Sequence, residues 1–134
     1  MILRRATGKA DWRLLAAIAA VSGLTAVMLA ALGAHSGLLR DASATRLWDT
    51  ALQMQLFHTA VILAIAALAM RLSSSSFIYT GLALALGTVV FSGSLYLRAA
   101  GLNWLPGIVT PVGGLVLIVA WFWLAVILLG KSAH

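Results

Sequence analysis

Charge is scarce in this sequence, and two residue types are missing altogether. Only 9% of the 134 residues are charged, and none of these is glutamate. A soluble domain carries about 25% charged residues, so this chain could not cover its own surface in water. Cysteine is also absent, which excludes disulfides, thiolate metal sites and cysteine nucleophiles.

The composition is dominated by apolar residues, at 63% of the chain with a mean hydropathy of +1.06. A membrane-spanning helix needs about 20 mainly apolar residues to cross roughly 30 Å of hydrocarbon. Four segments satisfy this requirement, at residues 14–33, 51–70, 77–97 and 108–129. They are rich in Ala and Leu and lack the alternation typical of strands. Short connections make successive helices antiparallel neighbours. We therefore predict one all-α domain over residues 1–134, a polytopic four-helix up-and-down transmembrane bundle.

The basic residues predict how this bundle is oriented. Four spans place the N-terminus, the loop after the second helix and the C-terminus on one side of the membrane. That side carries six of the nine basic residues: Arg4, Arg5, Lys9, Arg13, Arg71 and Lys131. The other side carries Arg40, Arg46 and Arg98. The positive-inside rule then predicts a multi-pass inner-membrane protein with both termini in the cytoplasm. The first apolar run is longer than the core of a signal peptide, so we expect no cleavage.

The partners that we expect follow from the same pattern. The basic residues form no stripe with interleaved aromatics, so nucleic acid is not an expected partner. The partner that the composition requires is the lipid bilayer, and a membrane-protein partner or a homo-oligomer is a further hypothesis. Tryptophans at 12, 48 and 104 fall where interfacial aromatics belong.

Polar residues at membrane depth need an explanation, because an unsatisfied polar group in hydrocarbon is costly. In this topology they gather in the outer half of the bundle, and the inner half is almost wholly aliphatic. The candidate ligand-binding residues are His35, Gln53, Gln55, His58, Ser92, Ser94, Tyr96, Arg98 and Thr110. Gln55 and His58 share one face of their helix, and Thr88, Ser92 and Tyr96 share one face of the next.

His58 is the sharpest candidate, and two interpretations of it stay open. A histidine inside a membrane can be a structural group that is hydrogen-bonded to a neighbouring helix. It can also be a proton relay or a ligand contact, which is the default for intramembrane ionisable residues. We expect no metal site and no cofactor, because His35 and His58 lie at different depths and no carboxylate inside the bundle completes a ligand set.

Small residues at helical spacing favour close helix packing, because hydrophobicity cannot drive association within lipid. The glycines that we assign to packing are Gly23, Gly33, Gly93, Gly113 and Gly114. Thr110 is predicted to cap the fourth helix, with Pro111 in its first turn.

Four stretches resemble one known family: residues 31–37 (ALGAHSG), 48–58 (WDTALQMQLFH), 91–97 (FSGSLYL) and 110–115 (TPVGGL). Together they are similar to the YgdD-type family of small membrane proteins, a family of unknown function with bacterial and eukaryotic members. The resemblance implies a four-helix inner-membrane protein with no established activity. Met54 and Ser36 depart from the pattern that the family leads us to expect.

Three functional hypotheses remain at this point. The leading one is a non-enzymatic protein whose outer-half polar cluster binds a small molecule, a lipid head group or a partner helix. The second is a small transporter or a subunit of a proton-coupled channel, which would have to oligomerise. The third is an intramembrane enzyme that pairs Ser92 or Ser94 with His58. No glycine-rich phosphate loop, paired carboxylates or zinc-binding motif supports catalysis.

Overall fold

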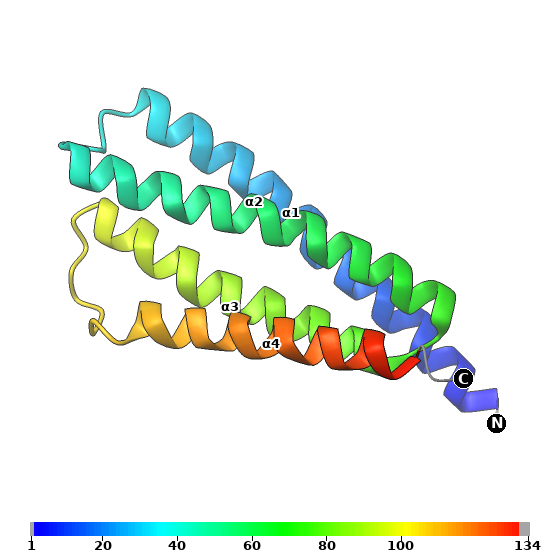
Figure 1. Ribbon diagram of the computed structural model, residues 1–134. Coiled ribbons are helices and arrows are strands. Elements are labelled where there is room, and N and C mark those ends of the chain that lie inside the picture. The colour runs from blue at the N-terminus through cyan, green and yellow to red at the C-terminus, as the bar shows by residue number, and fades with distance from the viewer. Residues whose placement is uncertain (1, 132–134) are drawn as a thin grey trace.

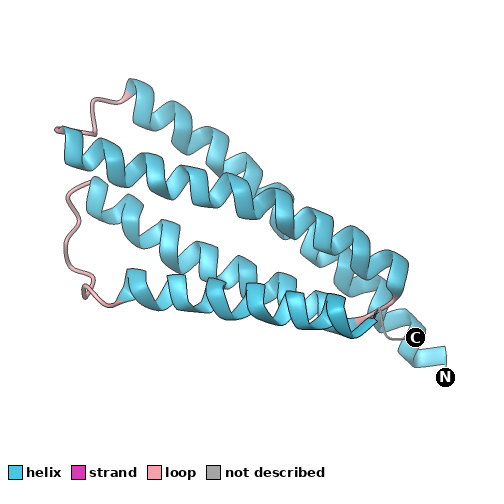
Figure 2. Cartoon of the chain, viewed as in Figure 1, coloured by secondary structure: helices cyan, strands magenta, loops and turns pink. Residues whose placement is uncertain are grey.

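The computed structural model describes residues 2–131, with side chains described for residues 11–130. It contains four helices, α1 (Ile2–His35), α2 (Ala42–Leu72), α3 (Ser75–Ala99) and α4 (Val109–Lys131). The described part of the chain has no strand (Figure 2). Each helix contains a segment long and apolar enough to cross a membrane, as the sequence predicts. The basic side chains at positions 4, 5, 9 and 131 lie outside the described side chains.

The helices run up and down, and both ends of the described chain lie at the same end of the bundle (Figure 1). α2 and α3 form the centre, α1 packs on α2, and α4 packs on α3. α1 also touches α3, but within the described residues α1 and α4 are not adjacent. The bundle is therefore open on the side where α1 and α3 diverge.

α2 begins well before the apolar run that identified it. Asp41 caps it, and the Asp41 carboxylate accepts the Ala44 N–H at 2.8 Å. A carboxylate at this position also complements the helix dipole. With 31 residues, α2 is about 46 Å long, which exceeds the roughly 30 Å hydrocarbon layer. Its first turns therefore reach the head-group region and carry the exposed side chains Arg46, Asp49, Thr50 and Gln53.

The core lies towards the end that holds the chain termini. Its largest fully buried side chains are Leu15, Ile62, Ile65, Phe77, Thr80 and Leu84. α1 and α3 meet there, where the Leu15 side chain occupies the space beside Gly81. A Cβ at Gly81 would overlap the end of the Leu15 side chain. Glycine at this position therefore permits the contact that joins α1 to α3.

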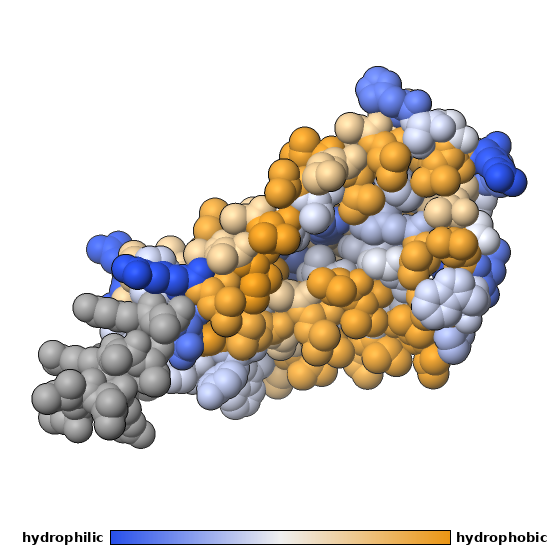
Figure 3. Space-filling view, turned by 180° about the vertical axis from the view of Figure 1, so that it is seen from behind, coloured by the Kyte–Doolittle hydropathy of each residue, from blue (hydrophilic) through white to orange (hydrophobic). Residues whose placement is uncertain are grey.

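The outer surface is largely apolar. Large hydrophobic side chains on all four helices are exposed, among them Leu24, Val89, Ile118 and Phe122. Figure 3 shows a broad apolar surface on one face of the molecule, with the most hydrophilic residues gathered towards its two ends. An exposed surface of this kind is compatible with lipid and not with water.

Candidate functional site

A polar network joins α1, α2 and α3 in the half of the bundle that holds the α1–α2 and α3–α4 loops, and Gln55 is at its centre. The Gln55 side-chain amide donates to the Ser22 carbonyl and to Thr25 Oγ1, both at 2.9 Å. Its Oε1 atom accepts the Tyr96 hydroxyl at 2.8 Å. Only 7% of Gln55 is exposed. One amide thus joins three helices through groups that would otherwise be unsatisfied in lipid.

Further hydrogen bonds extend this network along α2. The Ser22 and Thr59 hydroxyls lie 2.6 Å apart. The Ser92 hydroxyl donates across the α2–α3 interface to the Ala51 carbonyl at 2.8 Å. Gln55 lies 16 residues before Arg71, about 24 Å along the helix axis. The network therefore lies beyond the midplane, on the side of the α1–α2 and α3–α4 loops.

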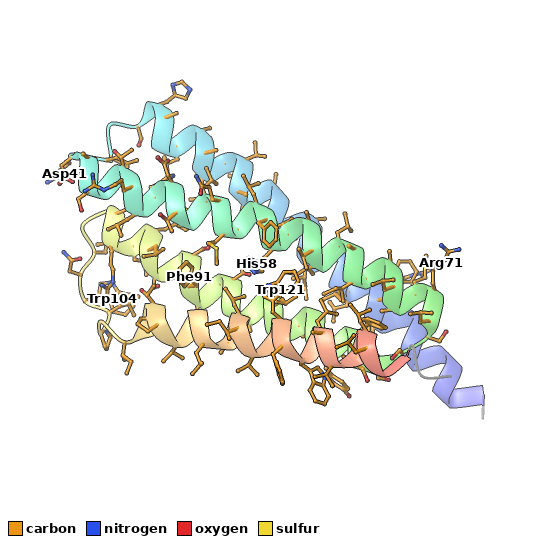
Figure 4. All side chains as sticks on the ribbon, viewed as in Figure 1. Asp41, His58, Arg71, Phe91, Trp104 and Trp121 are labelled. Carbon is orange, nitrogen blue, oxygen red and sulfur yellow. The ribbon has the colours of Figure 1, made fainter. Side chains whose placement is uncertain are left out.

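Trp48 lies inside the bundle, although the sequence pattern places it in an interfacial belt. It is 3% exposed, its ring packs edge-on against Tyr96 at 4.7 Å, and its indole N–H donates to the Leu29 carbonyl at 3.1 Å. Gly33 makes room for the indole, because a Cβ there would lie 2.5 Å from Trp48 Nε1. The close approach of α1 and α2 draws this ring inward. Trp104, by contrast, is 71% exposed in the α3–α4 loop (Figure 4).

His58 connects α2 to α4 through its side chain. Its Nδ1 lies 2.8 Å from the Met54 carbonyl, and the Trp121 indole N–H points at its Nε2 at 3.1 Å (Figure 4). A carbonyl can only accept and an indole N–H can only donate. The tautomer that carries its proton on Nδ1 satisfies both partners. Both ring nitrogens are engaged within the chain, which leaves neither of them for a ligand.

The Ser–His pairs considered above are not formed among the described side chains. Ser92 donates to Ala51, and Ser94 donates to the Phe91 carbonyl and pairs with the Thr110 hydroxyl at 2.7 Å. The same contact corrects the predicted cap, because α4 begins at Val109 and Thr110 joins α4 to α3.

The other predicted site residues are dispersed. His35 is exposed at the end of α1, and Gln53 is exposed on α2. Arg98 donates from Nη2 to the Pro106 carbonyl at 3.3 Å, and its buried Nε has no partner among the described residues. No three His or Asp side chains of the described chain come together as a metal site would require.

The five glycines assigned to packing fall into distinct environments. Gly33 and Gly113 lie at close helix contacts, since a Cβ at Gly113 would lie 2.5 Å from Phe91 N. At Gly23 and Gly114 a Cβ would meet its neighbours at 3.6 Å, an ordinary contact. A Cβ at Gly93 meets nothing within 4 Å, so Gly93 makes no close packing contact.

Gly93 instead lines a groove that opens between α1 and α3, with a volume of about 590 Å³. The Gln55 network forms part of its floor, and aliphatic side chains such as Leu14, Val21 and Val89 form its walls. In the view from behind, the groove is visible as a hollow in which polar residues lie between apolar ridges (Figure 3).

The residues that sequence reasoning missed are Ser22, Thr25 and Trp121. The i, i+3 spacing of Ser22 and Thr25 inside an apolar run is a signal that could have identified two of them.

Four apolar spans, lipid-compatible outer surfaces and buried polar contacts between helices define an integral membrane protein of the helical-bundle class. A family model described as "Protein of unknown function (DUF423)" matches residues 29–114, and the chain belongs to this family.

Several curated relatives support this assignment. The UPF0382 inner membrane protein YgdD of Escherichia coli is 42% identical over 111 residues, which cover 81% of this chain and 84% of that protein. The UPF0382 membrane protein YwdK of Bacillus subtilis is 34% identical over 112 residues, which cover 81% of this chain and 90% of that protein. A UPF0382 membrane protein of Haemophilus influenzae is 37% identical over 116 residues, which cover 81% of this chain and 87% of that protein. No solved structure matches the chain. The relatives thus agree with the four spans in making this chain an integral membrane protein.

Proposed function

We propose that this chain is a non-enzymatic inner-membrane protein that binds a membrane-soluble molecule in the groove between α1 and α3. The observation that carries this proposal is the groove itself. Its volume of about 590 Å³ falls in the range of about 300–1,000 Å³ that is typical of small-molecule sites. Apolar walls with a few convergent polar groups are the composition expected of such a site.

The closed end of the groove favours a small molecule over a partner helix. α1 and α3 meet where Leu15 packs against Gly81. A transmembrane helix, about 10 Å across, would have to pass this contact to lie along the whole groove. A molecule that occupies only the outer part meets no such obstacle.

The hydrogen bonds around the groove argue against catalysis. A serine nucleophile needs a base that accepts its proton, whereas the Ser92 hydroxyl donates to a backbone carbonyl. His58 has no free nitrogen with which to act as that base. The packed aliphatic core in the inner half likewise argues against a continuous path for an ion.

The orientation that we propose has both termini in the cytoplasm. Arg13 and Arg71 lie at the end of the bundle that holds the termini, together with the basic positions counted from the sequence. The groove would then open into the outer leaflet, because the Gln55 network lies towards the opposite end.

Filling the groove tests the proposal. Gly93→Leu places a side chain in open space on a helix, where leucine is favourable. Gly130→Leu is the matched control, because Gly130 is a helical glycine of α4 with nothing within 4 Å, away from the groove. Mass spectrometry of molecules that co-purify from native membranes should find a species with the wild type and with Gly130→Leu. That species should be lost with Gly93→Leu, and identical profiles for all three proteins would refute the proposal.

A further inference from the structure

The floor of the groove presents oxygen atoms to an occupant, because nearly all of its hydrogen-bond donors are already engaged. Six polar residues line the groove: Ser22, Thr25, Gln55, Thr88, Ser92 and Tyr96. Five of them give every side-chain donor to a carbonyl or hydroxyl of the chain. The Ser22 hydroxyl pairs with the Thr59 hydroxyl, and either of these two groups can be the donor.

Acceptor capacity remains on the same groups. A hydroxyl oxygen has two lone pairs, and an amide oxygen has two as well. Ser92 Oγ donates to the Ala51 carbonyl and Tyr96 Oη donates to Gln55 Oε1, so the lone pairs of both oxygens remain available. Gln55 Oε1 accepts one hydrogen bond and can accept a second. Ser92 is 2% and Gln55 7% exposed, so the polar part of the floor is small, and its free capacity is for accepting a hydrogen bond.

The lack of charged residues in the groove limits which ligands it can bind. None of the residues that line the groove is charged. An anionic head group needs donors or cations, and this surface offers neither. A cationic amine would find oxygens, but an uncompensated charge at this depth is costly.

Resting on the function proposed above, we infer that the ligand is a neutral, mainly apolar molecule that carries a hydrogen-bond donor, such as a long-chain alcohol. Its donor makes one hydrogen bond, to an oxygen of Ser92, Tyr96 or Gln55. Its hydrocarbon lies along Leu14, Val21 and Val89 towards the closed end of the groove.

Three probes with the same 16-carbon hydrocarbon chain distinguish recognition of a hydrogen-bond donor from simple apolar binding. They are 1-hexadecanol, its methyl ether, which has no donor, and hexadecyl phosphate, which is anionic. Native mass spectrometry of the purified full-length protein with each probe at equal concentration measures occupancy. Hexadecanol should bind about five-fold more strongly than either of the others, as one hydrogen bond would give.

Variants assign this preference to the floor of the groove. Ser92→Ala removes an acceptor and should shrink the preference for the alcohol. Ser94→Ala is the matched control, because Ser94 faces Thr110 of α4 and does not line the groove. It should retain the preference.

The outcomes separate the two proposals. Equal binding of all three probes that is lost with Gly93→Leu would overturn the donor inference and leave a binding groove. Probe binding that is unaffected by Gly93→Leu would overturn both proposals. A change of oligomeric state with Gly93→Leu in place of lost probe binding would assign the groove to a second protein.

Discussion

At the scale of single residues, most buried polar side chains in this membrane protein form hydrogen bonds that hold its helices together. Gln55, Trp48 and His58 each join their helix to another through a hydrogen bond. Hydrogen bonds between transmembrane helices are individually modest, at about 0.6 kcal/mol on average. Several together explain why polar side chains can lie at this depth without a ligand.

Gly33 tests the fit of Trp48. Gly33→Ala should lower the free energy of unfolding by about 1–3 kcal/mol, because the new methyl group would overlap the indole and break its bond to Leu29. Unfolding in mixed micelles measures the change. Gly23→Ala is the control, since a Cβ there meets Thr59 at 3.6 Å, and it should be nearly neutral. Equal effects at both glycines would contradict the predicted fit.

The His58–Trp121 hydrogen bond can be measured directly. His58→Leu leaves the Trp121 N–H without an acceptor, and Trp121→Phe removes the donor. A double-mutant cycle on unfolding free energy should give a coupling of about 1 kcal/mol. Neither single variant should alter the molecule retained by the groove, because neither residue lines it. If His58→Leu loses that molecule while its stability is unchanged, this prediction is wrong and His58 contacts the ligand.

At the scale of helices, the backbones of α3 and α4 approach closely where the two helices cross at Gly113. Gly113 faces the backbone of Phe91, and Ser94 and Thr110 bond nearby. α2 and α4, by contrast, have no such close backbone contact in the described residues, and His58, Phe57 and Trp121 connect them through their side chains. The helix pairs α1–α2 and α3–α4 are therefore joined chiefly through α2 and α3.

Alanine substitutions at neighbouring glycines test this crossing. Gly113→Ala should destabilise the protein by about 2 kcal/mol, because backbone atoms cannot move aside as a side chain can. Gly114→Ala should change stability by less than about 0.5 kcal/mol, since its Cβ meets the Phe91 ring at 3.6 Å. Thermal unfolding of both variants in one detergent provides the comparison. A more stable Gly113→Ala protein would show that the helices lie farther apart.

The sequence was informative about elements and less so about contacts. The four spans follow from hydropathy, because lipid imposes helix length and apolarity on each segment separately. The apolar run of the second span begins at residue 51, whereas α2 begins at Ala42, because residues 42–50 are too polar to register as a span although Asp41 caps them. Partners such as Trp121 for His58 could not be predicted, since they depend on how four helices rotate about their axes. The sequence predicts a packing role for Gly93, because residue spacing alone cannot show whether a neighbouring helix occupies the space beside a glycine.

At the scale of the whole molecule, the bundle is asymmetric in two directions. The half that holds the chain termini is aliphatic and packed, and the half that holds the α1–α2 and α3–α4 loops is polar and grooved. One lateral side is also open, because α1 and α4 do not meet in the described structure. A groove that faces the bilayer can admit a membrane-soluble molecule without passage through water.

The absence of cysteine makes the orientation simple to test. Single substitutions Ser74→Cys and Asn103→Cys place one thiol in the α2–α3 loop and one in the α3–α4 loop. In cells with an intact inner membrane, an impermeant maleimide should label position 103 from outside and position 74 only after permeabilisation. The reverse pattern would place the groove in the inner leaflet.

The most direct test of the central claim is a photo-crosslinker placed in the groove in native membranes. Val89 lines the groove and is 70% exposed, and Ile118 on α4 is 67% exposed and away from it. With benzoylphenylalanine at each position in turn, mass spectrometry identifies what each one contacts. A groove that binds a specific ligand should give one enriched small-molecule adduct at position 89 and mixed bulk phospholipid at position 118. The same phospholipid mixture at both positions, or a protein adduct at position 89, would contradict the account.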